Sequence, residues 1–237
     1  FSAEGLSLLD SCVWLDGDVP AAMAVVARRG DEARLAAFAM RPAYRGKGVG
    51  RRLMGSLLDA LREQGVRRMW LEVIRDNHAA VALYHSLGFE VRHGLCGYLS
   101  AQTASEESSV LQEYDVLALT RRAGAELNGQ LPWLMDPLTF STLPCRALSL
   151  HQQAFAVLAT LSSRPQLQFL WVEPAARGRG LGREMLMALA RQFPGLGTSV
   201  TIPERFTPLF QTAGYTPGVL KQYEMSATLS ALPSAGR

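Results

Sequence analysis

The stretch FAMRPAYRGKGVGRRLM, from Phe38 to Met54, decides the fold of this chain because it occurs twice. It aligns without a gap on LWVEPAARGRGLGREML, from Leu170 to Leu186, at an offset of 132 residues. A later pair, LYHSLGFE (Leu83 to Glu90) and LFQTAGYT (Leu209 to Thr216), keeps the same order at an offset of 126. The same parts in the same order indicate two related domains in tandem.

A third match suggests where the first copy ends. YDVLAL (Tyr114 to Leu119) is similar to YEMSAT (Tyr223 to Thr228), near the end of the chain. This predicts a first domain over residues 1–120 and a second over residues 121–237. Both lengths are ordinary for a single domain.

Composition narrows the class of protein. Hydrophobic residues make up 48% of the chain and charged residues 19%, enough for a buried core and unlike a disordered chain. The net charge is only +3 and the basic residues are not interleaved with aromatic ones, so we expect no nucleic-acid partner. No apolar stretch reaches the roughly 18 residues of a membrane span. We therefore expect no membrane partner and a cytoplasmic location, with the reservation that the chain opens at Phe1 and not at a methionine.

The three cysteines, Cys12, Cys96 and Cys145, lie far apart and lack the spacing of metal ligands. We expect reduced, buried thiols and no metal site.

Hydrophobic patterns predict the elements of the first copy. Three short apolar runs separated by turn residues are typical of antiparallel strands: SCVWLD, PAAMAVVARR and EARLAAFAM. After the glycines, apolar residues at helical spacing predict a helix that ends near Gly65. A strand over Met69–Ile74, a helix over Asn77–Leu87 and a strand from Phe89 follow.

The second copy repeats this order. ALSLHQ, FAVLATLSS and QLQFLWV are predicted strands, and Leu181, Met185 and Leu189 mark a helix. Residues 121–137 are predicted to form a helix, interrupted at Pro132, that opens the second domain. The polar residues 100–109 are predicted to be an exposed loop between the last two strands of the first domain.

Each glycine segment lies between a predicted strand and a predicted helix, where free backbone N–H groups and the helix dipole attract an anion. Gly46, Gly48 and Gly50 allow close approach of the backbone. A P-loop is excluded because Arg51-Arg52 follows the last glycine where Lys-Ser/Thr is required. A dinucleotide fingerprint is excluded because the loop follows an antiparallel meander.

Arg45-Gly46-Lys47-Gly48-Val49-Gly50 and its copy at 177–182 resemble motif A of the Gcn5-related N-acetyltransferase (GNAT) family. The run Asn77-x-x-Ala-x-x-Leu-Tyr-x-x-x-Gly-Phe89 resembles that family's motif B, and the two matches together cover about 55 continuous residues. The resemblance implies an α/β (α+β) chain of two tandem acyl-CoA N-acyltransferase folds, each a mixed, mostly antiparallel sheet flanked by helices. It also implies acetyl-CoA as the cofactor.

The resemblance further implies which residues hold the cofactor. The residues expected at the first site are Phe38, Ala39, Met40, Arg45, Gly46, Lys47, Gly48, Val49, Gly50, Arg51, Asn77 and Tyr84. A second candidate cofactor site comprises Val172, Arg177, Gly178, Arg179, Gly180, Leu181 and Gly182.

Two residues of the first copy are candidates for catalysis. Tyr84, on a predicted helix, is a candidate general acid toward the departing thiolate; the alternative is a helix tyrosine that packs its ring and leaves its hydroxyl in water. Glu72 is the single charged residue in MWLEVI, and strand alternation places it on the face of Trp70 and Ile74. The resemblance makes Glu72 a candidate general base; the alternative is an exposed or ion-paired strand residue. Asn77 either contacts the cofactor or caps its helix.

The second copy departs from this pattern. Phe210 stands where Tyr84 would be, and Val200 stands where Glu72 would be when Leu71–Ile74 is aligned with Ser199–Ile202. The second domain is therefore a relic that binds CoA, a structural partner or a wall of the acceptor pocket. GNAT proteins also usually begin with a strand and two helices before the point where this chain opens; residues 121–137 are one candidate substitute.

The predicted function is N-acetyl transfer from acetyl-CoA to an amine acceptor, either a small molecule or a peptide, by a monomer or homodimer. The alternative is a non-catalytic CoA-binding or protein-interaction module.

Overall fold

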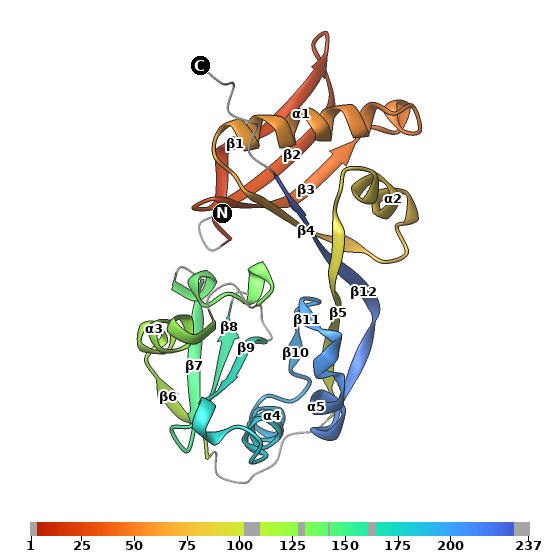
Figure 1. Cartoon of the computed structure of the whole chain (residues 1–237). Coiled ribbons are helices and arrows are strands. Elements are labelled where there is room, and N and C mark those ends of the chain that lie inside the picture. The colour runs from red at the N-terminus through yellow and green to blue at the C-terminus, as the bar shows by residue number, and fades with distance from the viewer. Residues whose placement is uncertain (1–3, 102–109, 128–130, 142, 161–164, 230–237) are drawn as a thin grey trace. The chain divides into compact units, whose positions relative to one another are not determined.

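The computed structural model describes all residues except 1–3, 102–109, 128–130, 142, 161–164 and 230–237 (Figure 1). The chain forms two compact units. Unit one comprises residues 1–93 and 223–237, and unit two comprises residues 94–222. The chain passes between the units inside two strands, β5 (Glu90–Ser100) and β12 (Tyr215–Thr228).

Unit one begins with the predicted antiparallel meander. The meander consists of β1 (Leu6–Asp16), β2 (Val19–Arg29) and β3 (Glu32–Met40). It is followed by a 3-10 turn η1 (Pro42–Tyr44), α1 (Val49–Glu63), β4 (Arg68–Ile74) and α2 (His78–Ser86). The strands lie in the order β1-β2-β3-β4-β12, and β4 runs parallel to β3. The three strands and two helices expected for the first copy are thus confirmed.

The core of unit one lies between its sheet and α1, which crosses the sheet in Figure 1. Met54, Leu57, Leu58 and Leu61 bury one face of α1 at helical spacing. They pack against apolar residues of the strands and against Met225, which is fully buried on β12. A strand from the end of the chain therefore completes the core of the first unit.

Unit two repeats the meander and adds elements around it. They are β6 (Gln112–Tyr114), α3 (Val116–Leu127), the 3-10 turns η2 (Trp133–Met135) and η3 (Pro137–Ser141), β7 (Cys145–Leu150), β8 (Ala154–Ala159), β9 (Gln166–Val172), η4 (Pro174–Ala176), α4 (Leu181–Gln192), β10 (Gly197–Thr198), β11 (Ile202–Pro203), η5 (Glu204–Phe206) and α5 (Thr207–Thr212). Its strands follow the order β5-β10-β9-β8-β7-β6, with β11 also paired to β5.

Helices cover both faces of the sheet in unit two. Leu119 and Ala123 of α3 pack on one face with Phe155 and Phe169. Met185 and other residues of α4 pack on the opposite face. The alternation of side chains along β8 and β9 supplies both layers.

Two expectations require correction. Residues 121–137 are not one interrupted helix: α3 begins earlier, at Val116, and ends at Leu127, and only 3-10 turns follow Pro132. Nor does YDVLAL match YEMSAT in structure, since the former runs from β6 into α3 and the latter lies within β12. β6 pairs with β7 and thus belongs to the sheet of unit two. The predicted loop at 100–109 falls almost wholly outside the described residues. The domain boundary expected at Thr120 remains a prediction.

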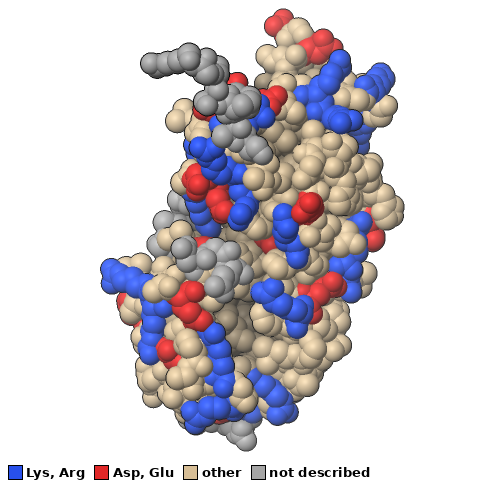
Figure 2. Space-filling model, in the orientation of Figure 1, with Lys and Arg blue, Asp and Glu red and all other residues tan. Residues whose placement is uncertain are grey.

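No described helix is both long enough and apolar enough to cross a membrane. In the face shown in Figure 2, basic and acidic side chains are interspersed.

Candidate functional site

The glycine loop of unit one lies where β3 leads into α1. Gly46 and Gly48 both adopt φ +72°, a left-handed conformation that favours glycine, and nothing lies within 4 Å of an added Cβ at either position. Gly48 caps α1, whose first turn contains no acidic residue. Among the described residues, no carboxylate pairs with the exposed side chains of Lys47 and Arg51. The loop thus presents free N–H groups and positive charge at an open helix N-terminus.

Two strands separate beside this loop. β3 and β4 pair from Glu32 and Arg68 as far as Leu35 and Leu71, although β3 continues to Met40. The backbone of residues 38–40 remains paired to β2 on its other side. The edge of β3 that faces away from β2 is therefore free of strand pairing at the residues expected to meet the cofactor arm.

The loop and the second motif meet through one contact. A Cβ on Gly50 would lie 3.6 Å from Cδ2 of Leu83 and 3.3 Å from Cε of Met40. Leu83 immediately precedes Tyr84 on α2. The structure therefore brings the loop, the end of β3 and the helix that carries the candidate acid into one place.

Tyr84 is buried, with a ring 5.8 Å from that of Phe89 between centroids. Burial raises the pKa of its hydroxyl to about 12. None of the described residues forms a hydrogen bond with that hydroxyl. Tyr84 is therefore protonated at neutral pH and free to donate.

Glu72 lies on the opposite face of β4 from Leu71 and Val73, as strand alternation predicts. Its carboxylate is held by Arg34 of β3: Arg34 Nε donates to Oε1 at 3.0 Å and to Oε2 at 2.8 Å. The distance from Nη2 to Oε2 is 2.7 Å, and both side chains are 7% exposed. Glu72 is thus an ion-paired residue, and the pair fixes its carboxylate in place.

Arg34 was missed by the sequence reasoning. Burial alone would lower the pKa of its guanidinium, but the charges and hydrogen bonds of Glu72 and Glu4 raise that pKa above its ordinary value. The signal was available, because Arg34 is the one charged residue inside the otherwise apolar run from Ala33 to Met40. Two isolated opposite charges in neighbouring strands favour an ion pair.

Asn77 caps α2. Its Oδ1 accepts a hydrogen bond from Ala80 N at 3.2 Å. The capping interpretation accounts for this oxygen.

Unit two contains the same loop in the same conformation. Gly180 caps α4 with φ +84°, as Gly48 caps α1. Arg177 Nε donates to Val172 O at 3.0 Å, and Arg45 Nε donates to Met40 O at 2.9 Å. Gly178 also has positive φ.

The second motif is also in its predicted place. A Cβ on Gly182 would lie 3.8 Å from Leu209 and 3.7 Å from Val172, the counterparts of Leu83 and Met40. Phe210 follows Leu209 and is buried, so the ring of Tyr84 has a counterpart without a hydroxyl.

Strand register corrects one assignment in this copy. The last pair of β9 and β10 joins Leu167 to Thr198, as Leu35 joins Leu71 in unit one. The counterpart of Glu72 is then Ser199, and not Val200. The earlier alignment was displaced by one residue because β10 is short and gave little pattern to match. Ser199 carries no carboxylate, so a base is missing in either alignment.

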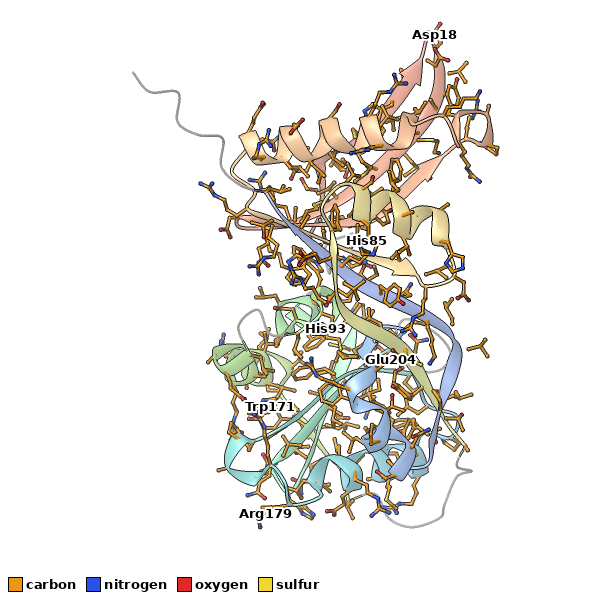
Figure 3. All side chains as sticks on the ribbon, turned by 45° about the vertical axis from the view of Figure 1, so that its right-hand side comes forward. Asp18, His85, His93, Trp171, Arg179 and Glu204 are labelled. Carbon is orange, nitrogen blue, oxygen red and sulfur yellow. The ribbon has the colours of Figure 1, made fainter. Side chains whose placement is uncertain are left out.

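The charges at the second loop also differ. Glu184 lies in the first turn of α4, where Arg52 lies in α1. Glu126 of α3 binds both Arg177, at 2.6 Å, and Trp171 Nε1, at 2.8 Å. Figure 3 labels Trp171 of this network and Arg179 of the loop. These carboxylates make the second loop a weaker anion site than the first.

Comparison with known proteins identifies the fold of this site. Residues 4–89 match the model of the acetyltransferase (GNAT) family. Over these residues the chain is similar to the GNAT family. The match includes the glycine loop, Glu72 and Tyr84.

Among characterised GNAT relatives, the [ribosomal protein bS18]-alanine N-acetyltransferase of Escherichia coli K12 is 51% identical over 59 residues, which are 25% of this chain and 40% of that protein. N-alpha-acetyltransferase RimI of Mycobacterium tuberculosis is 57% identical over 49 residues, which are 21% of this chain and 29% of that protein. The chain thus spans less than half of the length of either relative.

Solved structures extend the GNAT likeness to both units. A GCN5-related N-acetyltransferase from Sphaerobacter thermophilus has a TM-score of 0.64 at 15% identity, covering 90% of this chain and 78% of that one. A tandem GNAT protein from the clavulanic acid biosynthesis pathway has a TM-score of 0.59 at 12% identity, covering 93% and 83%. The predicted fold class, a mixed α/β chain with tandem GNAT folds, is confirmed.

Proposed function

We propose that this chain is an acetyl-CoA-dependent N-acetyltransferase whose reaction centre lies in unit one. The observation that carries the proposal is the meeting of the open loop at Gly48 with the helix that bears Tyr84, through Leu83. The similarity of this region to N-acetyltransferases acting on a protein alanine supports the same conclusion.

The residues of unit one fit acetyl-CoA. The N–H groups around Gly46, Gly48 and Gly50, with Lys47 and Arg51, would hold the diphosphate. Free backbone groups at the end of β3 would pair with the pantetheine arm. When bound, acetyl-CoA supplies an acyl group activated as a thioester.

The proposed chemistry is direct attack. With acetyl-CoA bound, the amine nitrogen would attack the acetyl carbonyl carbon and the C–S bond would break. Tyr84 would donate its proton to the departing sulfur and regain the proton that the nitrogen loses on becoming an amide. Glu72 accepts the proton lost by the incoming ammonium, directly or through water. Its Oε1 receives one contact from Arg34, while Oε2 receives two, so Oε1 retains more accepting capacity.

The proposed acceptor is an amine, and we propose that this amine belongs to a protein N-terminus and not to a small metabolite. The support is that the E. coli relative is named as an alanine N-acetyltransferase of ribosomal protein bS18, and that the M. tuberculosis relative is named as an N-alpha-acetyltransferase. Unit two lacks both the acid and the base, so for it alone we propose the non-catalytic role.

The test is thiol release from acetyl-CoA by the full chain, measured with a thiol reagent against peptides with a free N-terminal alanine. Matched peptides with an acetylated N-terminus are the control. Turnover with the first set alone supports the proposal. Binding of acetyl-CoA without turnover on peptides or small amines would leave a CoA-binding module instead.

A further inference from the structure

Unit two contains a cavity of about 390 Å³ that the proposed reaction does not use. It opens where β9 and β10 cease to pair, between α3, α4 and α5. Its lining is mostly apolar, and its charged members are Glu126, Arg177 and Arg205. A volume of this size and an apolar wall with few polar groups are typical of small-molecule sites.

The charges inside the cavity largely cancel. Glu126 is bound by Arg177 and by the indole of Trp171, so neither its carboxylate nor the Arg177 guanidinium is left unpaired. Phe210 supplies a ring without the hydroxyl that Tyr84 has in unit one. The interior therefore favours an aliphatic body.

One cation remains at this cavity. Arg205 is exposed, and its guanidinium lies 4.9 Å from the ring centroid of Phe206. The neighbouring Glu204, labelled in Figure 3, pairs with Lys221 at 3.0 Å. Within the described part of the chain, no carboxylate pairs with Arg205. An anionic group on a ligand would find its complement there.

The adjoining loop is poorly suited to a diphosphate. Glu184 places a negative charge in the first turn of α4. Arg183 Nε donates to Thr212 O at 2.9 Å, and Arg177 is held by Glu126. Arg177 and Arg183 are therefore already engaged, and within the described residues Arg179 is the one basic group of this loop without an ion pair or hydrogen bond.

We infer that this cavity binds a small amphiphilic carboxylate, with its aliphatic chain among the apolar side chains and its carboxylate at Arg205. The occupant differs from CoA in carrying one anionic group and no diphosphate. This inference concerns unit two alone, so it stands independently of the proposed reaction in unit one.

The test is calorimetric titration of the full chain with sodium octanoate, octylamine and 1-octanol. We expect octanoate to bind at least about tenfold more tightly than either other probe. Arg205→Gln, an exposed change, should remove that preference. Equal binding of the three probes by the unaltered chain would overturn the assignment of Arg205.

Gly182 offers a second variant with a matched control. A Cβ there would meet only ordinary contacts at 3.7 to 3.8 Å, so Gly182→Ala should retain binding. Gly182→Leu should fill the cavity and abolish binding. Retained binding in Gly182→Leu would place octanoate elsewhere and overturn the site.

CoA is the competing occupant. In Gly48→Asp, where the loop of unit one is blocked, CoA should not displace octanoate. Competitive displacement in that background would show a second CoA site and overturn the inference.

Discussion

Arg34 and Glu72 form a two-pronged ion pair between neighbouring parallel strands of unit one, with all three contacts between 2.7 and 3.0 Å. Arg34 lies beside Trp70 in the strand register, so its side chain reaches along β4 to the next residue on the same face. The pair fixes the direction of the carboxylate that we propose as the base. Both charges are buried, so each is stabilised by the other.

Glu72→Gln should therefore affect stability as well as catalysis. Removing one member of a buried pair leaves an uncompensated charge, and we expect the free energy of unfolding of unit one to fall by about 3 kcal/mol. The carboxylate of Glu4 lies 3.0 Å from Arg34 and still compensates part of its charge, which limits the loss of stability. Urea unfolding measures it, with Arg34→Met/Glu72→Met as the control because it removes both charges. A double variant less stable than the single variant would contradict this account.

The same Glu72→Gln variant should lose turnover most at low pH, where more of the amine is protonated and needs a base. The measurement is a pH profile of kcat/KM. A profile parallel to that of the unaltered chain would leave Glu72 with a structural role only.

Tyr84→Phe should lower kcat by about 10² to 10⁴-fold, because it removes the proton donor and keeps the ring. The KM for acetyl-CoA should change little. Phe210→Tyr is the matched control in unit two and should leave turnover unchanged, since Glu126, the carboxylate that lines the same cavity, is bound by Arg177 and Trp171. If Tyr84→Phe keeps full activity, the general acid is another group.

The burial of Tyr84 should also make the free energy of unfolding depend on pH in the alkaline range. Its pKa in the folded chain is about 12 against 10.0 in the unfolded chain, so the unfolded state loses this proton first as pH rises. Its contribution is complete below pH 10 and is lost between about 10 and 12, and it amounts to about 3 kcal/mol at most. Tyr84→Phe should show a smaller fall in unfolding free energy over this interval. An equal fall in both proteins would contradict the burial of this hydroxyl.

Gly48 allows a test that separates charge from backbone strain. Asn and Asp both tolerate the left-handed conformation better than other residues with a Cβ. Gly48→Asn should weaken CoA binding moderately, whereas Gly48→Asp should abolish it by placing a negative charge in the phosphate cradle. Thermal stabilisation by CoA measures both variants. Equal effects would mean that the loop does not hold the diphosphate.

Met225→Ala tests the contribution of β12 to unit one. Met225 is fully buried in the core that contains Met54 and Leu71, and we expect a loss of about 2 to 5 kcal/mol. Hydrogen exchange should show the loss of protection in β4, with β8 less affected. The exposed Met23→Ala is the control. A loss confined to β8 would contradict the division into units.

The sequence by itself determined the repeated meander, the glycine loops and the helix that carries Tyr84. These features are local: turn residues, helical spacing and the conformational freedom of glycine act within a few residues of one another. The sequence likewise showed that the second copy lacks the acid, because Phe210 aligns with Tyr84 and has no hydroxyl.

Only the tertiary structure decided what depends on distant segments. Arg34 meets Glu72 across 38 residues of chain, Ser199 takes the place of Glu72 through strand register, and Met225 fills the core of a unit that begins at the other end of the chain. A short apolar strand fits many sheet edges equally well by pattern. Which edge it joins is settled by the side chains that it buries there, and those lie far away in the sequence.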